Sequence, residues 1–145
     1  MFRALTLALA LSAPAAMAQG TPGTHFVENW DLDADGTVTA AELTERRDMV
    51  FGMFDDDQND ILDAAEYANF DETRAADMAQ NAGDQGNGQG GGRMMQGLTL
   101  DYNDTDGDGL VTRAEFTAGG AGWFVLMDQN SDGAITNDDF GRRGN

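Results

Sequence analysis

The sequence contains no cysteine, and this absence excludes several kinds of site. Disulfide frameworks, zinc-thiolate sites, iron–sulfur clusters and cysteine nucleophiles all require the missing thiol. Histidine is nearly absent too: His25 stands alone, so neither a catalytic triad nor a histidine-based zinc site can be assembled. The only serines are Ser12 and Ser131. We therefore expect no catalytic residues and predict that the protein is not an enzyme.

Positive charge is also scarce in this chain. The 145 residues include 8 basic residues, all of them arginine, and 26 acidic residues, which gives a formal net charge of −18. Nucleic acids and anionic membranes carry the same sign of charge, so neither is expected as a partner. Of the acidic residues 20 are aspartate, a poor helix former but a short oxygen ligand. This excess indicates a role for the carboxylates beyond solubility, in a chain long enough for one domain or two very small ones.

Long hydrophobic runs are missing except at the N-terminus. A basic start at Arg3 is followed by a small and apolar run over residues 4–13 and by the pattern Ala16-Met17-Ala18. These features are typical of a secretory signal peptide over residues 1–18, and the run is shorter than the roughly 20 residues that span a bilayer. We expect a periplasmic or secreted protein that leaves the membrane after cleavage, with a mature charge of −18 − 1 = −19.

Four acidic stretches of equal length align without gaps and organise the rest of the chain. We call them loops one to four: residues 31–42, 55–66, 104–115 and 128–139. Their starts are separated by 24, 49 and 24 residues, so they form two similar pairs. Positions 1, 3 and 5 carry Asp or Asn, position 8 is apolar, and Gly36, Gly109 and Gly133 stand at position 6. A solvated acidic turn does not require this repeated glycine, which permits the left-handed conformation that reverses a chain.

This pattern resembles the twelve-residue calcium loop of the EF-hand family. A calcium ion takes six to eight oxygens at about 2.4 Å. In such a loop they come from positions 1, 3 and 5, the backbone carbonyl of position 7 and both carboxylate oxygens of position 12. The assignment predicts these metal ligands: Asp31, Asp33, Asp35, Thr37, Glu42, Asp55, Asp57, Asn59, Ile61, Glu66, Asp104, Asp106, Asp108, Leu110, Glu115, Asp128, Asn130, Asp132, Ala134 and Asp139.

The four loops are not equivalent. Loops one and three have the full ligand set with glycine at position 6. Loop two carries Asp60 at that position, which tolerates left-handed backbone less well than glycine, and an additional carboxylate, Asp63, at position 9. Loop four ends in Asp139, one methylene shorter than glutamate. We expect weaker calcium binding there, or a shift toward Mg²⁺, because contact through both carboxylate oxygens becomes harder.

The short segments inside each pair predict how the loops are arranged. Residues 43–54 separate loops one and two, and residues 116–127 separate loops three and four. Two helices and a turn do not fit there, whereas one shared helix of about 15 residues, roughly 22 Å long, does. A straight helix holds its two loops at opposite ends, so the loops should pair across the halves: two with three and one with four, or the converse. Glycines in these segments, such as Gly52 and Gly120, are the residues that would bend the helices.

The expected fold is all-α, with four helix–loop–helix motifs in two closely spaced pairs and small β contacts between loops. Residues 19–80 form the first pair and residues 98–145 the second, while residues 81–97, rich in Gly, Gln and Asn, are expected to be a flexible linker. The segment that enters loop three alternates instead of following a helical period, so its helix is the least expected. Apolar residues beside the loops predict the core: Phe26, Val27, Trp30, Leu43, Val50, Phe51, Phe54, Tyr67, Phe116, Trp123, Phe124, Met127 and Phe140.

Within the EF-hand family, the layout resembles that of lanmodulin-like proteins, which are periplasmic and bind lanthanides selectively. The shared features are a secretory signal, four loops and about a dozen residues between neighbouring loops. That family typically has Asp at position 9, where only Asp63 matches, and a short middle gap, where this chain has 37 residues (67–103). It also has Pro at position 2, where this chain has Leu32, Asp56, Thr105 and Gln129.

We therefore predict an extracytoplasmic protein that binds up to four calcium ions as a buffer, a sensor or a metal-stabilised binding protein. Lanthanide selectivity is the first alternative. Dockerin modules, which use calcium loops with Asp at position 12 for protein docking, are the second, and would imply an unidentified protein partner. In every case the close carboxylates repel one another without metal, so metal binding should contribute to folding.

Overall fold

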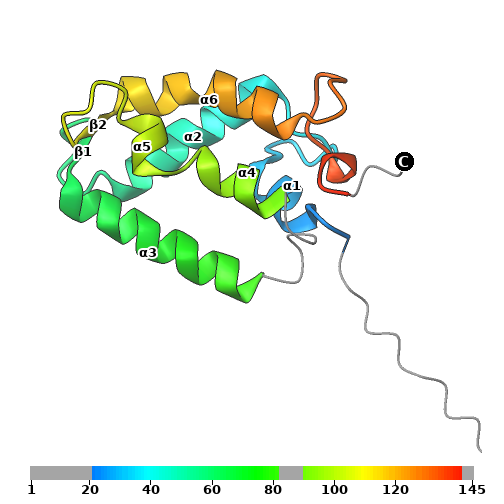
Figure 1. Ribbon diagram of the computed structural model, residues 1–145, viewed down its shortest axis with the longest axis horizontal. Helices are drawn as coiled ribbons and strands as arrows, with labels where there is room; N and C mark the ends of the chain where they lie inside the picture. Colours follow the sequence, from blue (N-terminus) through cyan, green and yellow to red (C-terminus); the bar gives the residue numbers. More distant parts are fainter. Residues whose placement is uncertain (1–20, 82–89, 142–145) are drawn as a thin grey trace, which may run out of the picture.

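The computed structural model describes residues 21–81 and 90–141, so the predicted signal peptide, residues 1–18, lies outside the described residues. The described part is mainly helical with a small two-stranded sheet, as the sequence predicts (Figure 1). None of its helices is both long and apolar enough to cross a bilayer. In chain order the elements are α1 (Thr24–Trp30), α2 (Ala40–Phe54), β1 (Ile61–Leu62), α3 (Ala64–Gln80), α4 (Gly90–Gln96), α5 (Leu100–Asn103), β2 (Val111–Thr112), α6 (Arg113–Met127) and a 3-10 turn (Asn137–Asp139).

Helices α2 and α6 are the two shared helices that the spacing predicts, and each has 15 residues. Each begins within the last three residues of one loop and ends directly before the next loop. Thr39 and Thr112 start them with a capping box, in which the threonine hydroxyl accepts a backbone N–H and a glutamate three residues on accepts the threonine N–H. The two helices lie side by side in opposite directions (Figure 1).

The glycines of α6 do not break the helix. Gly120 is buried where α2 crosses, and a Cβ atom at this position would lie 3.1 Å from Cδ of Arg47. The small residue therefore lets the two helices approach closely, and the packing between them outweighs the low helix propensity of glycine.

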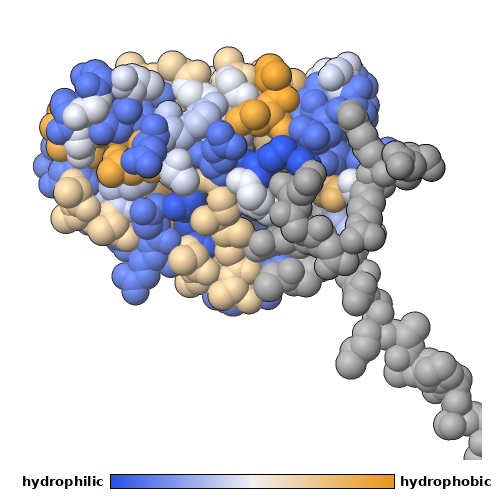
Figure 2. All heavy atoms as spheres, viewed as in Figure 1, coloured by the Kyte–Doolittle hydropathy of each residue, from blue (hydrophilic) through white to orange (hydrophobic). Residues whose placement is uncertain are grey.

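The loops pair across the two halves of the chain. Loops two and three meet in the antiparallel strands β1 and β2, where Leu62 lies opposite Val111. Loops one and four meet at a single bridge, in which Val38 and Ile135 exchange two backbone hydrogen bonds of 2.9 Å. All four of these residues occupy position 8 and are buried. The predicted pairing across the halves is confirmed, and of the two arrangements left open the structure has loop two with loop three and loop one with loop four. Hydrophilic side chains gather at both ends of the visible face (Figure 2).

One continuous core joins the two halves of the chain, and its centre is polar. Arg47 of α2 is fully buried and donates to the backbone oxygens of Phe116 and Gly97 and to Oδ1 of Asn103. Its guanidinium also lies 4.2 Å from the ring centroid of Phe116. Burial lowers the pKa of Arg47 to about 10, so the group stays charged at neutral pH. These bonds tie α2 to α6 and to the segment that leads into loop three.

Three local features differ from the expected helix pattern. Residues 90–96 of the predicted linker 81–97 form α4, which packs on α6, while residues 82–89 lie outside the described residues. The Trp123 indole donates to the Arg93 carbonyl (3.0 Å), and Met94 packs against the core, so tertiary contacts outweigh the poor helix propensity of glycine. The helix that enters loop three, α5, has only 4 residues. Loop four ends in the 3-10 turn, where the sequence predicts the start of an α-helix.

Candidate metal centres

The backbone of all four loops is left-handed at the same two positions. Positions 4 and 6 have positive φ in every loop: Ala34 and Gly36, Gln58 and Asp60, Gly107 and Gly109, Ser131 and Gly133. Apart from Gly23, these are all the residues with positive φ in the described part of the chain. The sequence predicts this conformation at position 6 only. At position 4 glycine occurs in loop three alone, so no residue type signalled the second left-handed position.

The carboxylate at position 1 stabilises this left-handed backbone by accepting hydrogen bonds from the loop. Asp31, Asp55, Asp104 and Asp128 accept the N–H of position 6 at 2.7, 3.1, 3.0 and 3.0 Å. They also accept the N–H of position 5, at 3.0–3.3 Å. A left-handed conformation is unfavourable for a non-glycine residue, and hydrogen bonds to a charged carboxylate oppose that cost. At Ala34 and Asp60 the N–H of the left-handed residue itself donates to the position-1 carboxylate, which stabilises the conformation there.

The residue at position 12 closes each loop. Glu42, Glu66, Glu115 and Asp139 accept the N–H of position 2 at 2.9, 2.8, 3.1 and 2.8 Å with one oxygen. With the other they accept the N–H of position 9 at 2.8, 3.0, 2.9 and 2.8 Å. The Thr112 N–H, followed by the Thr112 and Thr105 hydroxyls, lowers the pKa of Glu115 to about 2. The same arrangement, led by the Thr39 N–H, lowers the pKa of Glu42.

Asp139 spans loop four although its side chain is shorter than glutamate. It is 2% exposed and lies in the 3-10 turn (Asn137–Asp139). This tighter turn takes the place of the first helical turn that carries the glutamate in the other loops. Both oxygens of Asp139 therefore reach the same two backbone positions as the glutamates do.

Carboxylates converge inside three of the loops. Oxygens of Asp31, Asp33 and Glu42 in loop one, of Asp55, Asp57 and Glu66 in loop two, and of Asp104, Asp106 and Asp108 in loop three lie within 4.8 Å of one another. Desolvation and then the charge of Asp35 raise the pKa of Asp33, which is the expected sign of carboxylate crowding. Such oxygen clusters are the donor set that a hard divalent cation prefers, so the residues fit calcium.

Loop four has no such trio of acidic residues among the described residues, because Asn130 stands at position 3. Its position 5 still behaves like those of the other loops. Asp35, Asn59, Asp108 and Asp132 each accept the N–H of position 7, at 2.7–3.0 Å. The structure thus places positions 1, 5 and 12 of all four loops in one repeated hydrogen-bonded arrangement. Metal ligation stays a prediction for every residue of the predicted set, including the position-7 carbonyls of Thr37, Ile61, Leu110 and Ala134.

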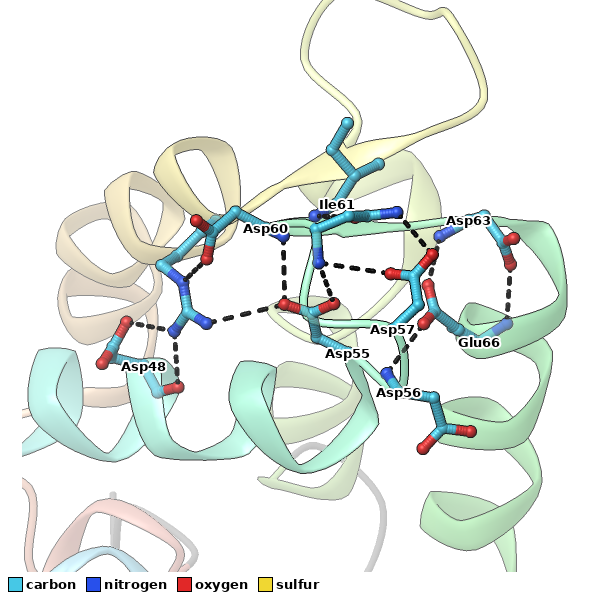
Figure 3. A network of polar contacts seen from close by, with 10 residues as sticks. Asp48, Asp55, Asp56, Asp57, Asp60, Ile61, Asp63 and Glu66 are labelled. Atoms are coloured by element: carbon cyan, nitrogen blue, oxygen red, sulfur yellow. Dashed lines mark hydrogen bonds and ion pairs between the residues drawn. The ribbon is translucent and has the colours of Figure 1, made fainter.

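Sequence reasoning missed one residue at these sites, Arg113, the first residue of α6. Its Nε lies 2.6 Å from Oδ1 of Asp60, and its terminal nitrogens lie 2.8 Å from Oδ1 of Asp48 and 3.7 Å from Oδ2 of Asp55 (Figure 3). Arg113 belongs to loop three, whereas Asp60 and Asp55 belong to loop two. The available signal was its position: it is the one basic residue within the four loops.

Comparison with known proteins supports this interpretation for part of the chain. A family model of the EF hand matches residues 121–142, which include the end of α6 and all of loop four. No curated protein matches the chain. The match indicates calcium binding and a helix–loop–helix motif at loop four, the loop with Asn130 at position 3 and Asp139 at position 12.

Proposed function

We propose that this chain is an EF-hand protein that binds up to four calcium ions, one in each of loops one to four. The observation that carries the proposal is the fourfold repetition of one hydrogen-bonded loop geometry, centred on carboxylates at positions 1 and 12. Three convergent carboxylate clusters and the family match at loop four support it. We further propose that residues 1–18 are a signal peptide and that the mature protein acts in the periplasm or outside the cell.

Binding and folding are coupled in this proposal. The acidic side chains of each loop repel one another at neutral pH, and α1, α4 and α5 have 7, 7 and 4 residues, too few to be stable alone. A bound cation offsets that repulsion, so part of its binding free energy becomes folding free energy. Extracellular calcium modules commonly have dissociation constants of about 10⁻⁴–10⁻³ M, a range that suits a buffer or a metal-stabilised binding protein.

A titration of the metal-free chain from Gln19 onward tests the proposal. Free Ca²⁺ is raised in buffered steps while far-ultraviolet circular dichroism reports helix content. We expect helix to increase in the micromolar-to-millimolar range, with sodium chloride at matched ionic strength as the control. An unchanged spectrum, together with no heat of binding by calorimetry, would contradict calcium binding.

Lanthanide binding is the second candidate, favoured by the spacing of about a dozen residues between neighbouring loops, which α2 and α6 span. The same titration with La³⁺ separates the candidates. If La³⁺ raises helix content many decades below the calcium range, the protein is a lanthanide-selective binder. If the two ions act over comparable ranges, calcium is the physiological choice. A docking role would instead require a defined protein partner that is retained only in calcium.

A further inference from the structure

Arg113 contacts loop two rather than the loop to which it belongs. It occupies position 10 of loop three, directly after β2, and its backbone N–H donates to the Asp60 carbonyl at 3.0 Å. This bond continues the ladder in which Ile61 pairs with Thr112. The strand pairing therefore fixes Arg113 against position 6 of the opposite loop before any side-chain contact is considered.

The guanidinium then spans three acidic residues of α2 and loop two. It bonds to Asp60 (2.6 Å) and Asp48 (2.8 Å) and lies 3.7 Å from Asp55, the position-1 carboxylate. Its carbon lies 4.6 Å from the ring centroid of Phe51, so the group stacks on an aromatic face as well. Asp55 is 4% exposed, so Arg113 lies against a carboxylate that solvent reaches poorly.

The other pair of loops has no counterpart to this contact. Position 10 of loop four is Asn137 and position 6 of loop one is Gly36, so neither the cation nor its partner carboxylate exists there. Loop two is also the one loop with a carboxylate at position 6. Asp60 of loop two and Arg113 of loop three, which both depart from the repeat, therefore lie opposite each other across β1 and β2.

A fixed positive charge at this place has two physical consequences. Without metal it offsets repulsion among the carboxylates of loop two, because opposite charges lie within a few ångströms. The same charge lowers the affinity of the loop for a metal ion, because the guanidinium repels the incoming cation and already interacts with the Asp55 carboxylate that would bind it. Asp60 limits this effect, since its own negative charge partly neutralises the guanidinium.

We propose that Arg113 is a positioning residue that serves loop two as a built-in counter-cation. It holds the metal-free loop in its binding geometry and sets the calcium affinity of that loop below the value its carboxylates alone would give. This inference rests on the proposed function, since it concerns calcium binding at loop two.

Site-resolved nuclear magnetic resonance of the whole chain tests the inference. The position-6 N–H donates to the position-1 carboxylate in every loop, so its proton shift reports on its own loop. A calcium titration that follows the amides of Gly36, Asp60, Gly109 and Gly133 gives one midpoint for each loop. Thermal unfolding in excess chelator gives the stability of the metal-free state.

Two substitutions should move the Asp60 midpoint in opposite directions. Arg113→Met keeps the stacking on Phe51 but removes the charge, and we expect the Asp60 midpoint to fall about three- to tenfold. The metal-free melting temperature should fall as well. Asp60→Asn leaves the guanidinium less neutralised and should raise the same midpoint. A merely structural role would weaken binding in both variants.

Two further variants separate local charge from other effects. Arg113→Lys retains the charge but loses the planar fork and the stacking on Phe51, so we expect an Asp60 midpoint between those of the parent and Arg113→Met. Arg46→Met removes the same unit of charge from α2, at a residue that makes no ion pair within the described residues, and should leave every midpoint nearly unchanged.

The outcomes distinguish failure of the inference from failure of the proposed function. If none of the four amides of the unmodified protein responds to calcium, the proposed function fails and the inference fails with it. If they respond but Arg113→Met leaves the Asp60 midpoint unchanged or raises it, the inference alone is overturned. An equal shift of all four midpoints in Arg113→Met would also overturn it, since the effect would then be global.

Discussion

The two ends of the molecule are built from the same repeat but are held together differently. At one end, loops two and three share the two-residue strands β1 and β2 and the Arg113 contacts. At the other, loops one and four meet at the single bridge between Val38 and Ile135, and neither loop contains a basic residue. A residue outside a loop's own twelve positions therefore contributes to its charge environment, because the strand ladder aligns position 10 of loop three with position 6 of loop two.

The largest expected effect concerns both ends equally, because Arg47 lies between them. Arg47→Met leaves the oxygens of Phe116, Gly97 and Asn103 without their buried donor. We expect a loss of about 3 kcal/mol or more in the free energy of unfolding, measured by urea denaturation in saturating calcium. Arg46→Met is the matched control. A loss below about 1 kcal/mol would show that the buried guanidinium is dispensable.

A smaller effect should distinguish the two ends of the molecule. Glu66→Gln removes the position-12 charge of loop two, and we expect calcium affinity at that loop to fall about tenfold or more. Because β1 pairs directly with β2, the effect should reach loop three more strongly than loop one, which is connected through α2. The position-6 amide shifts measure each loop. Glu45→Gln is the charge-matched control, and an equal effect on loops one and three would remove the distinction between the ends.

Asp139→Glu should make the weaker end resemble the stronger one. The longer side chain offers both oxygens to a cation more easily, so we expect a few-fold gain in calcium affinity at loop four. Asp139 already forms the same two backbone bonds as the glutamates, so the gain is limited by how the 3-10 turn accommodates the extra methylene. The Gly133 amide provides the measurement, and Asp138→Glu is the control. An unchanged midpoint would mean that side-chain length does not limit this site.

The smallest effect is a pH dependence shared by one loop at each end. Backbone and hydroxyl donors lower the pKa of Glu115 from 4.5 to about 2 and also lower that of Glu42. A lowered pKa means that the contribution to metal-free stability is complete above the ordinary pKa of a glutamate. It is lost as the pH falls toward 2. Melting temperatures in chelator from pH 6 to 2 should decline in that window. A constant melting temperature would contradict the role of these bonds.

The two shared helices and the pairing of loops across the halves could be predicted because they depend only on the spacing of the loops in the sequence. A gap of twelve residues excludes two helices whatever their composition, so α2, α6 and the cross-pairing of loops followed from distance alone. The sequence also showed that position 8 is apolar in every loop, but the predicted core did not include these residues. Val38 and Leu62 are in fact 0% and 1% exposed.

Features that depend on contacts between distant residues could not be predicted from the sequence. At Ala34 the residue's own N–H donates to Asp31, and after Gln58 the next N–H, that of Asn59, donates to Asp55. Local residue preference reveals neither bond. Helix α4 forms in a glycine-rich segment because it packs against α6. The role of Arg113 depends on which loop lies opposite, and that became clear only once the strands were paired.

The shared helices and the paired strands have a consequence for the connectivity of the molecule. Loop one is connected to loop two by α2, loop two to loop three by β1 and β2, loop three to loop four by α6, and loop four to loop one by the Val38–Ile135 bridge. The four loops therefore form a closed ring in which each has two neighbours. Breaking one connection leaves all four loops still joined through the other three, whereas breaking two divides the ring. A single damaging substitution should consequently weaken every loop by a graded amount rather than isolate one of them.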